Sequence, residues 1–170
     1  MQLLTFTVGA EVYAVASRLV VEVLPLVPAR PIPHMPPFVR GIFSYRGRII
    51  PLVDLGLLLL GRPLHERLST RVIVIDLPAA CAGNGPAVPR LGMVAENVVS
   101  FCTADAATPS LPAWHMPDAP YLGRVLRIDG RTVQLIATEH LLPPALAAVL
   151  ADPPVDGGPQ GSSAPSPRAP

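Results

Sequence analysis

Histidine and carboxylate side chains are the residues of this chain that could bind a metal ion or carry acid–base catalysis. None of the four histidines pairs with another histidine, a cysteine or a carboxylate at a metal-binding helical spacing. His65 and Glu66 could begin a zinc-protease helix, but the second histidine of that motif, four positions after the first, is missing. The sequence therefore predicts no metal site. The four histidines are His34, His65, His115 and His140.

Motifs for nucleophilic catalysis are missing as well. Residues 41–45 contain a serine but end in tyrosine, where the nucleophile elbow of hydrolases requires glycine. Asp54 is better explained as a helix cap, and Asp76 as the last residue of a strand. No glycine-rich phosphate loop precedes a helix, and all 13 basic residues are arginine, which excludes a lysine nucleophile. We therefore predict that the protein is not an enzyme and binds no cofactor.

Composition limits the remaining classes of function. Half of the 170 residues are apolar and 15% are charged, which is typical of a well-packed globular domain. The net charge of +1 gives no electrostatic reason to bind nucleic acid. No run approaches the ~18 apolar residues of a membrane helix, and the first basic residue, Arg18, comes too late for a signal peptide. We expect a soluble, cytoplasmic protein that does not insert into a membrane.

Two charged residues stand out because their neighbours are apolar or tightly turned. Glu22 interrupts the apolar run of residues 20–24, and Arg46 precedes Gly47 at a tight turn. Both side chains could be solvated and contribute little, since an exposed ion pair contributes about 0–1 kcal/mol. Alternatively, they lie side by side as a polar feature on an apolar docking face. We predict that the two charges lie within one polar patch, close enough for direct or water-bridged contact. A separation above roughly 12 Å, which exceeds the Debye length, would contradict this prediction.

A pattern that occurs twice indicates how these residues are positioned. Residues 13–23 match residues 91–101, and residues 43–54 match residues 126–137, with apolar residues at most corresponding positions. Two copies are too few for a solenoid, so the repeat predicts two similar units packed side by side. Partners commonly dock between two such units.

Short strands separated by turns run through both copies, which is typical of small barrels or sandwiches. The Asp129-Gly130 pair is the strongest hairpin turn, because both residues tolerate positive φ. Asp54 should cap a helix over residues 55–60 that ends at Gly61, and Thr138 should cap a turn over residues 139–142. A second helix is expected over residues 145–151. The expected strands cover residues 4–8, 12–15, 20–24, 40–43, 48–53, 71–76, 91–94 and 98–101, with a further hairpin around residues 128–131.

Three segments should lie outside these strands. Residues 25–37 and 78–89 are rich in proline or small residues and predict irregular loops. Residues 151–170 consist mostly of proline, glycine and serine and have almost nothing to bury, so they should be disordered. The sequence thus predicts an all-β domain of two small barrels over residues 1–150, followed by a disordered tail.

Residues 38–55, with the sequence FVRGIFSYRGRIIPLVDL, resemble the signature stretch of the CheW family. Residues 6–9, 13–15, 20–23, 91–98 and 135–142 resemble other parts of that family in the right order, so the resemblance covers about residues 2–143. It implies two five-stranded SH3-like barrels. It also implies a non-enzymatic adaptor that couples methyl-accepting chemoreceptors to a CheA-type histidine kinase. Such adaptors are cytoplasmic, work at membrane-associated receptor arrays, and serve flagellar, pilus or surface-sensing pathways.

The resemblance also implies where partners bind. The kinase carries a related double-barrel regulatory domain that contacts the adaptor barrel to barrel, and the receptor's cytoplasmic tip docks by the groove between the adaptor's barrels. Val20, Glu22 and Arg46 match family positions implicated in this coupling. To these three positions we add neighbouring residues of the signature stretch and residues of the second copy of the repeat. The resulting partner-binding candidates are Val20, Glu22, Gly41, Arg46, Gly47, Met93 and Val98.

The sequence also departs from the family pattern. Ser44-Tyr45 stands where family members often have Asn-Leu, and Glu96 and Ala137 stand where aspartate is usual. One alternative is an unrelated small-barrel module that binds proline-rich or extended peptides. Such a module needs an aromatic groove, and aromatic residues make up only 5% of this chain.

Overall fold

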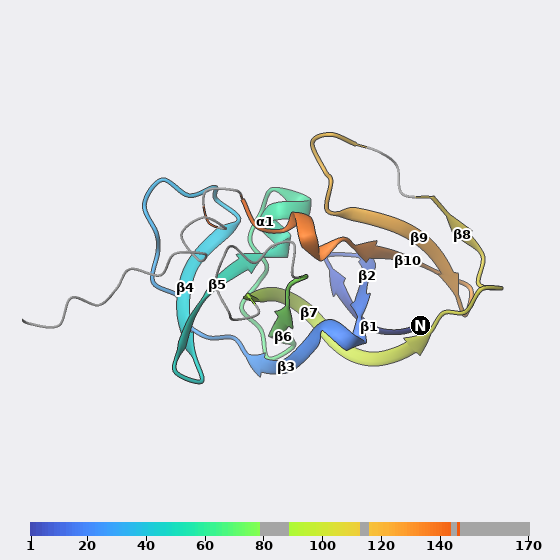
Figure 1. Cartoon of the computed structure of the whole chain (residues 1–170), viewed down its shortest axis with the longest axis horizontal. Coiled ribbons are helices and arrows are strands. Elements are labelled where there is room, and N and C mark those ends of the chain that lie inside the picture. Colours follow the sequence, from blue (N-terminus) through green and yellow to red (C-terminus); the bar gives the residue numbers. More distant parts are fainter. Residues whose placement is uncertain (79–88, 113–115, 144–145, 147–170) are drawn as a thin grey trace, which may run out of the picture.

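The structure is a computed structural model that describes residues 1–78, 89–112, 116–143 and 146 (Figure 1). Within these residues the chain is mostly β, as expected, with one short α-helix and two single-turn 3-10 helices. The helices are α1 (Leu55–Leu60), η1 (Ser17–Leu19) and η3 (Thr138–His140). The strands are β1 (Gln2–Val8), β2 (Glu11–Ala16), β3 (Val20–Pro25), β4 (Val39–Tyr45), β5 (Arg48–Asp54), β6 (Thr70–Asp76), β7 (Arg90–Thr103), β8 (Ser110–Leu111), β9 (Leu122–Ile128) and β10 (Arg131–Ile136).

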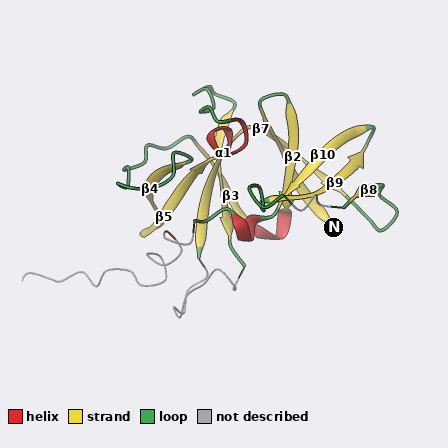
Figure 2. Cartoon of the chain, turned by 90° about the horizontal axis from the view of Figure 1, so that it is seen from above, coloured by secondary structure: helices red, strands yellow, loops and turns green. Residues whose placement is uncertain are grey.

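The strands form two units that share β7. The first unit contains β3 to β6 and the start of β7, which pairs with β6 and β5. The second unit contains β1, β2, β8, β9 and β10 with the end of β7, which pairs with β1. Figures 1 and 2 both place β4 and β5 on one side of the molecule and β8 to β10 on the other. The expected all-β architecture of two small SH3-like barrels is confirmed, although the strand pairing does not close the sheet.

The repeat seen in the sequence has a structural counterpart. In the first unit Leu52 of β5 pairs in parallel with Gly92 of β7. In the second unit Leu135 of β10 pairs in parallel with Ala14 of β2. The alignment of the two sequence copies places Leu52 opposite Leu135 and Gly92 opposite Ala14. Equivalent positions therefore make the same parallel contact in both units, and each contact joins a segment of one copy to a segment of the other.

β7 corrects the expectation of two separate strands over residues 91–94 and 98–101. It is one strand of 14 residues with an irregularity near its middle, where Asn97 adopts a φ of 47°. The pairing of β1 with β7 shifts register between Thr5 and Thr7, and the Asn97 side-chain amide donates to the Thr7 hydroxyl at 2.9 Å. Such a bulge bends a strand, which lets β7 pass from one unit into the other.

Most of the turns and helix ends predicted from local sequence are present in the structure. The two hairpin turns are nearly identical, with φ values of 49° and 75° at Arg46-Gly47 and 50° and 77° at Asp129-Gly130. Gly61 ends α1 at a φ of 68°. Thr138 does not cap a turn as expected; it is the first residue of η3, and the capping position belongs to Ala137. The expected helix over residues 145–151 and the tail lie outside the described residues, apart from Leu146.

The core is shared unequally between the two units. A large cluster of buried side chains extends from the first unit across the boundary and includes Phe6 of β1 and Ile136 of β10. The second unit has its own smaller cluster, which includes Leu3 and Leu126. α1 contacts both units, because it packs on β1, β5 and β7 and the Tyr121 hydroxyl donates to the Leu58 carbonyl at 3.3 Å. The first unit and the boundary therefore provide a rigid base for the site described next.

Candidate functional site

Five polar side chains gather at one end of the first unit, and we call them the rim cluster: Glu22, Tyr45, Arg46, Asp76 and Arg90. They come from the start of β3, the end of β4, the β4–β5 turn, the end of β6 and the start of β7. Antiparallel pairing of β3 with β6, β6 with β7 and β4 with β5, together with parallel pairing of β5 with β7, brings these strand ends to the same side. Topology alone therefore places residues up to 68 positions apart at one rim.

Glu22 is the central acceptor of the rim cluster. Its Oε2 accepts a hydrogen bond from the Tyr45 hydroxyl at 2.6 Å and another from Arg46 Nη2 at 2.8 Å. The predicted proximity of Glu22 and Arg46 is thus confirmed as a direct ion pair. The Tyr45 hydrogen bond and the Arg46 charge lower the pKa of Glu22, and the bond to Glu22 raises the pKa of Tyr45. At neutral pH, therefore, the carboxylate is charged and the phenol remains a donor.

Tyr45 links this pair to a second one. Arg90 Nε donates to Asp76 Oδ1 at 2.8 Å, and the two residues are direct cross-strand neighbours. The guanidinium carbons of Arg46 and Arg90 lie 5.4 and 5.9 Å from the centre of the Tyr45 ring, within cation–π range. The ring itself is only 4% exposed. Tyr45 is therefore a buried platform that holds both arginines.

The rim cluster also spans an open seam. Within the described residues no ladder joins β3 to β4; an isolated bridge between Arg30 and Ile42 connects β4 to the segment that follows β3. The side-chain contacts of Glu22 with Tyr45 and Arg46 also join β3 to the end of β4 across this seam. Arg46 nevertheless keeps 69% of its side chain exposed, and Glu22 keeps 34%. The cluster can stabilise the seam and still offer hydrogen-bond donors to a partner.

The other partner-binding candidates occupy different environments. Val20 and Val98 are half-buried against the main core, and Met93 is fully buried within it and offers no surface to a partner. Gly47 completes the β4–β5 turn next to Arg46. Gly41 lies in β4 at a φ of 136°, where an added Cβ would overlap the Arg30 carbonyl. Gly41 thus has a structural reason to be glycine, which is the close approach of two backbones.

We expect Gly41→Ala to destabilise the fold by about 2–4 kcal/mol, because it adds backbone strain to steric overlap. Gly47→Ala is the matched control: its φ of 75° is also unfavourable for alanine, but no atom lies within 4 Å of the new Cβ. That control should cost only about 1–2 kcal/mol. Urea denaturation of both variants measures the difference, and equal losses would show that the Arg30 contact is unimportant.

An apolar groove adjoins the rim cluster along the same seam. It has a volume of about 440 Å³. The exposed side chain of Ile49, at 57%, lies at this groove just after the β4–β5 turn. Polar rim and apolar groove together form a mixed surface of the kind that protein partners cover. The lining residues are Val27, Pro28, Arg30, Ile42, Phe43, Ser44 and Ile49.

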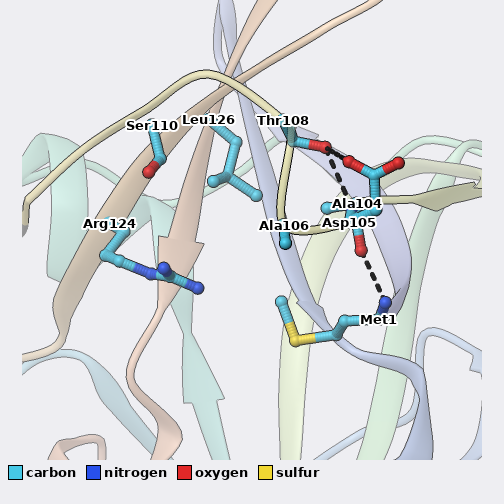
Figure 3. Close-up of a pocket in the computed structure, with 8 residues that line it drawn as sticks. All are labelled: Met1, Ala104, Asp105, Ala106, Thr108, Ser110, Arg124 and Leu126. Carbon is cyan, nitrogen blue, oxygen red and sulfur yellow. Dashed lines mark hydrogen bonds between the residues drawn. The ribbon is translucent and has the colours of Figure 1, made fainter.

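A second hollow, of about 320 Å³, lies in the other unit. Figure 3 shows Arg124 and Ser110 on one wall and Asp105 with Thr108 on the other. The Thr108 hydroxyl donates to Asp105 Oδ1 at 3.0 Å, so this carboxylate is bound within its own loop. In the described part of the chain, Arg124 forms no ion pair and no three metal-ligating side chains come together. The lining of this hollow is mainly polar, whereas the lining of the groove beside the rim cluster is mainly apolar.

Comparison with known proteins gives the family. Residues 2–145 match the CheW-like domain family. The chain belongs to this family. The alternative of an unrelated small-barrel module is therefore wrong.

Individual relatives agree with this assignment. The chemotaxis protein CheW of Rhizobium meliloti is 24% identical over 143 residues, which cover 84% of this chain and 87% of that protein. The CheW of Treponema pallidum is 43% identical over 75 residues, which cover 44% of this chain but only 39% of that longer relative. The scaffolding protein TtCheW of Thermoanaerobacter tengcongensis has the same fold, with a TM-score of 0.70 at 20% identity over 84% of this chain and 87% of that one.

Sequence reasoning found two members of the rim cluster in this CheW-family chain and missed three. The sequence explains Asp76 only as a strand-end residue and Tyr45 only as a departure from the family pattern. Arg90 belongs to no motif, although a charged residue at each end of the 78–89 loop is a usable signal. Strand ends that flank one loop lie close together when the strands pair.

The Glu22 carboxylate should make the stability of this CheW-like domain depend on pH. Because its folded-state pKa is lowered, its contribution is complete above the ordinary glutamate value of 4.5 and is lost as pH falls through the lower folded-state value. The difference in urea midpoint between the wild type and Glu22→Gln should therefore be constant near neutral pH and shrink at acid pH. A difference that does not change down to about pH 3 would contradict this assignment.

Proposed function

We propose that this protein is a non-enzymatic adaptor that couples methyl-accepting chemoreceptors to a CheA-type histidine kinase in a chemosensory array. The observation that carries this proposal is the exposed rim cluster, in which the family-matched Glu22 and Arg46 form a direct contact beside an apolar groove. An adaptor needs binding surfaces and no reacting groups. The match of residues 2–145 to the CheW-like domain family supports the same role.

The two partners are assigned to different surfaces. The rim cluster and groove lie at the β4–β5 turn and the neighbouring strand ends of the first unit. Figure 2 shows β4 and β5 on the side of the molecule away from β8 to β10. An end-on contact with the barrel of a kinase regulatory domain suits this position. The receptor tip is assigned to the boundary between the units, where the half-buried Val98 packs against the main core.

The proposed location is the cytoplasm, at receptor arrays beneath the membrane. No helix in the described part of the chain is long and apolar enough to cross a bilayer. Attachment to the array would then come from binding to receptor and kinase rather than from insertion into the membrane.

Reconstitution tests the coupling role. Purified receptor signalling fragment and CheA-type kinase are mixed with and without this protein, and kinase autophosphorylation and co-sedimentation are measured. We expect this protein to bind both partners and to make kinase activity respond to the receptor. Binding to neither partner would overturn the proposal, and binding to the kinase alone would exclude a coupling role.

We further propose that residues 1–150 form the complete functional domain and that residues 151–170 are dispensable. The tail has no apolar periodicity with which to offset the entropy of ordering. Truncation before Asp152 should leave the Tm and kinase binding unchanged. A drop of several degrees in a thermal melt would show instead that the tail packs on the domain.

A further inference from the structure

The rim cluster has many more hydrogen-bond donors than acceptors. Each guanidinium group carries five N–H donors. Among the described residues, Arg46 uses one nitrogen on Glu22 and Arg90 uses one on Asp76. Both arginines are partly exposed, at 69% and 25% of their side chains. The formal charges cancel, but most of the N–H donors of the two arginines have no acceptor in these two carboxylates.

Tyr45 makes the two arginines one site. Its buried ring lies against both guanidinium carbons, and its hydroxyl holds the carboxylate that binds Arg46. A leucine, often found here in the family, could make neither contact. The cluster is therefore a property of this chain's own Ser44-Tyr45 departure rather than of the Glu22–Arg46 pair alone.

We propose that Arg46 and Arg90 form one site that binds carboxylate side chains of the kinase regulatory domain, with Tyr45 as the positioning residue. Among side-chain acceptors, carboxylates match the forked geometry of guanidinium. The kinase is the assigned source because the site lies at the start of β7, whereas Val98, at the boundary assigned to the receptor tip, lies eight residues further along that strand. This inference rests on the proposed function and adds Arg90, Tyr45 and the chemistry of the contact.

Removing the charge of Asp76 should strengthen kinase binding, whereas removing Arg90 should weaken it. Asp76 accepts from Arg90 Nε and so competes with a carboxylate of the partner for the same arginine. Removing its charge releases Arg90. If Arg90 only stabilises the fold, loss of its partner should leave binding unchanged or weaken it; if Arg90 binds the kinase, the loss should strengthen binding.

Calorimetry of the full chain with the kinase regulatory domain, and separately with a receptor tip fragment, tests the site. Arg90→Gln should weaken kinase binding about tenfold or more and leave receptor binding unchanged. Asp76→Asn should strengthen kinase binding by about threefold. Tyr45→Phe should weaken it and also reduce the effect of a second Arg46→Gln change, a coupling that a purely structural role would not produce. Arg124→Gln, in the other unit, is the control and should bind as the wild type does.

The outcomes separate the two proposals. If the wild type binds neither partner, the adaptor function fails. If the wild type binds the kinase and folded Arg90→Gln binds it equally well, only the carboxylate site is overturned. Loss of receptor binding alone would overturn the assignment to the kinase. If Arg90→Gln does not fold, Asp76→Asn decides: unchanged or weaker kinase binding contradicts the site.

Discussion

Arg46→Glu is expected to weaken binding to the proposed kinase partner by about thirtyfold or more, without unfolding the protein. The wild-type side chain is 69% exposed at the β4–β5 turn, so the substitution removes little burial. At an interface it removes a donor and adds a charge that repels acidic groups of the partner and Glu22. Truncating one member of such a desolvated pair commonly costs about 2–5 kcal/mol of binding free energy, and a reversal of charge should cost at least as much.

Calorimetry with the receptor fragment and with the kinase regulatory domain, beside a thermal melt, measures this effect. The loss of the Glu22 contact should lower the Tm by no more than about 2–4 °C. Arg62→Glu is the matched control, because Arg62 is an exposed arginine that follows α1 at the opposite end of the first unit. Wild-type affinity of Arg46→Glu for both partners would refute an interfacial role, and a collapsed melting curve would make Arg46 structural.

Asp54→Ala is expected to destabilise the fold by about 3–5 kcal/mol, the largest loss of stability predicted for this protein. Asp54 is fully buried, and its Oδ1 accepts from the backbone amides of Gly56 and Leu57 at 2.8 and 3.2 Å, which caps α1. Its Oδ2 pairs with Arg40 Nε at 2.7 Å and Nη2 at 2.6 Å. Alanine would leave two amides and a guanidinium without these acceptors. The predicted capping role of Asp54 is thus confirmed, and the pairing with Arg40 adds to it.

Urea denaturation at neutral pH measures the loss. Glu66→Ala is the matched control, because Glu66 also pairs with Arg40, at 3.5 Å, but is 73% exposed. It should cost less than about 1 kcal/mol. Asp54→Asn can still cap α1 and should fall between the two variants. Similar stability for Asp54→Ala and Glu66→Ala would show that burial does not strengthen the Arg40–Asp54 contact.

Features set by neighbouring residues could be predicted from the sequence. The Arg46-Gly47 and Asp129-Gly130 turns follow from local backbone preference, and the cap at Asp54 follows from a side chain that reaches amides two and three residues on. The repeat predicted the two units because equivalent apolar positions must face equivalent cores. Even the contact between Glu22 and Arg46 could be predicted, because each charge is isolated beside apolar residues and an ion pair satisfies both.

Contacts between distant segments were decided by the tertiary structure. The continuity of β7 depends on the bulge at Asn97, which is useful only because two units meet there. Met93 matches a sequence motif, yet the shared core buries it completely. The rim cluster joins strand ends from 22 to 90 along the chain, so Arg90 and Tyr45 meet only after the sheet has formed. Sequence patterns report which face of a strand is apolar, whereas the neighbours of a strand end depend on the packing of the whole sheet.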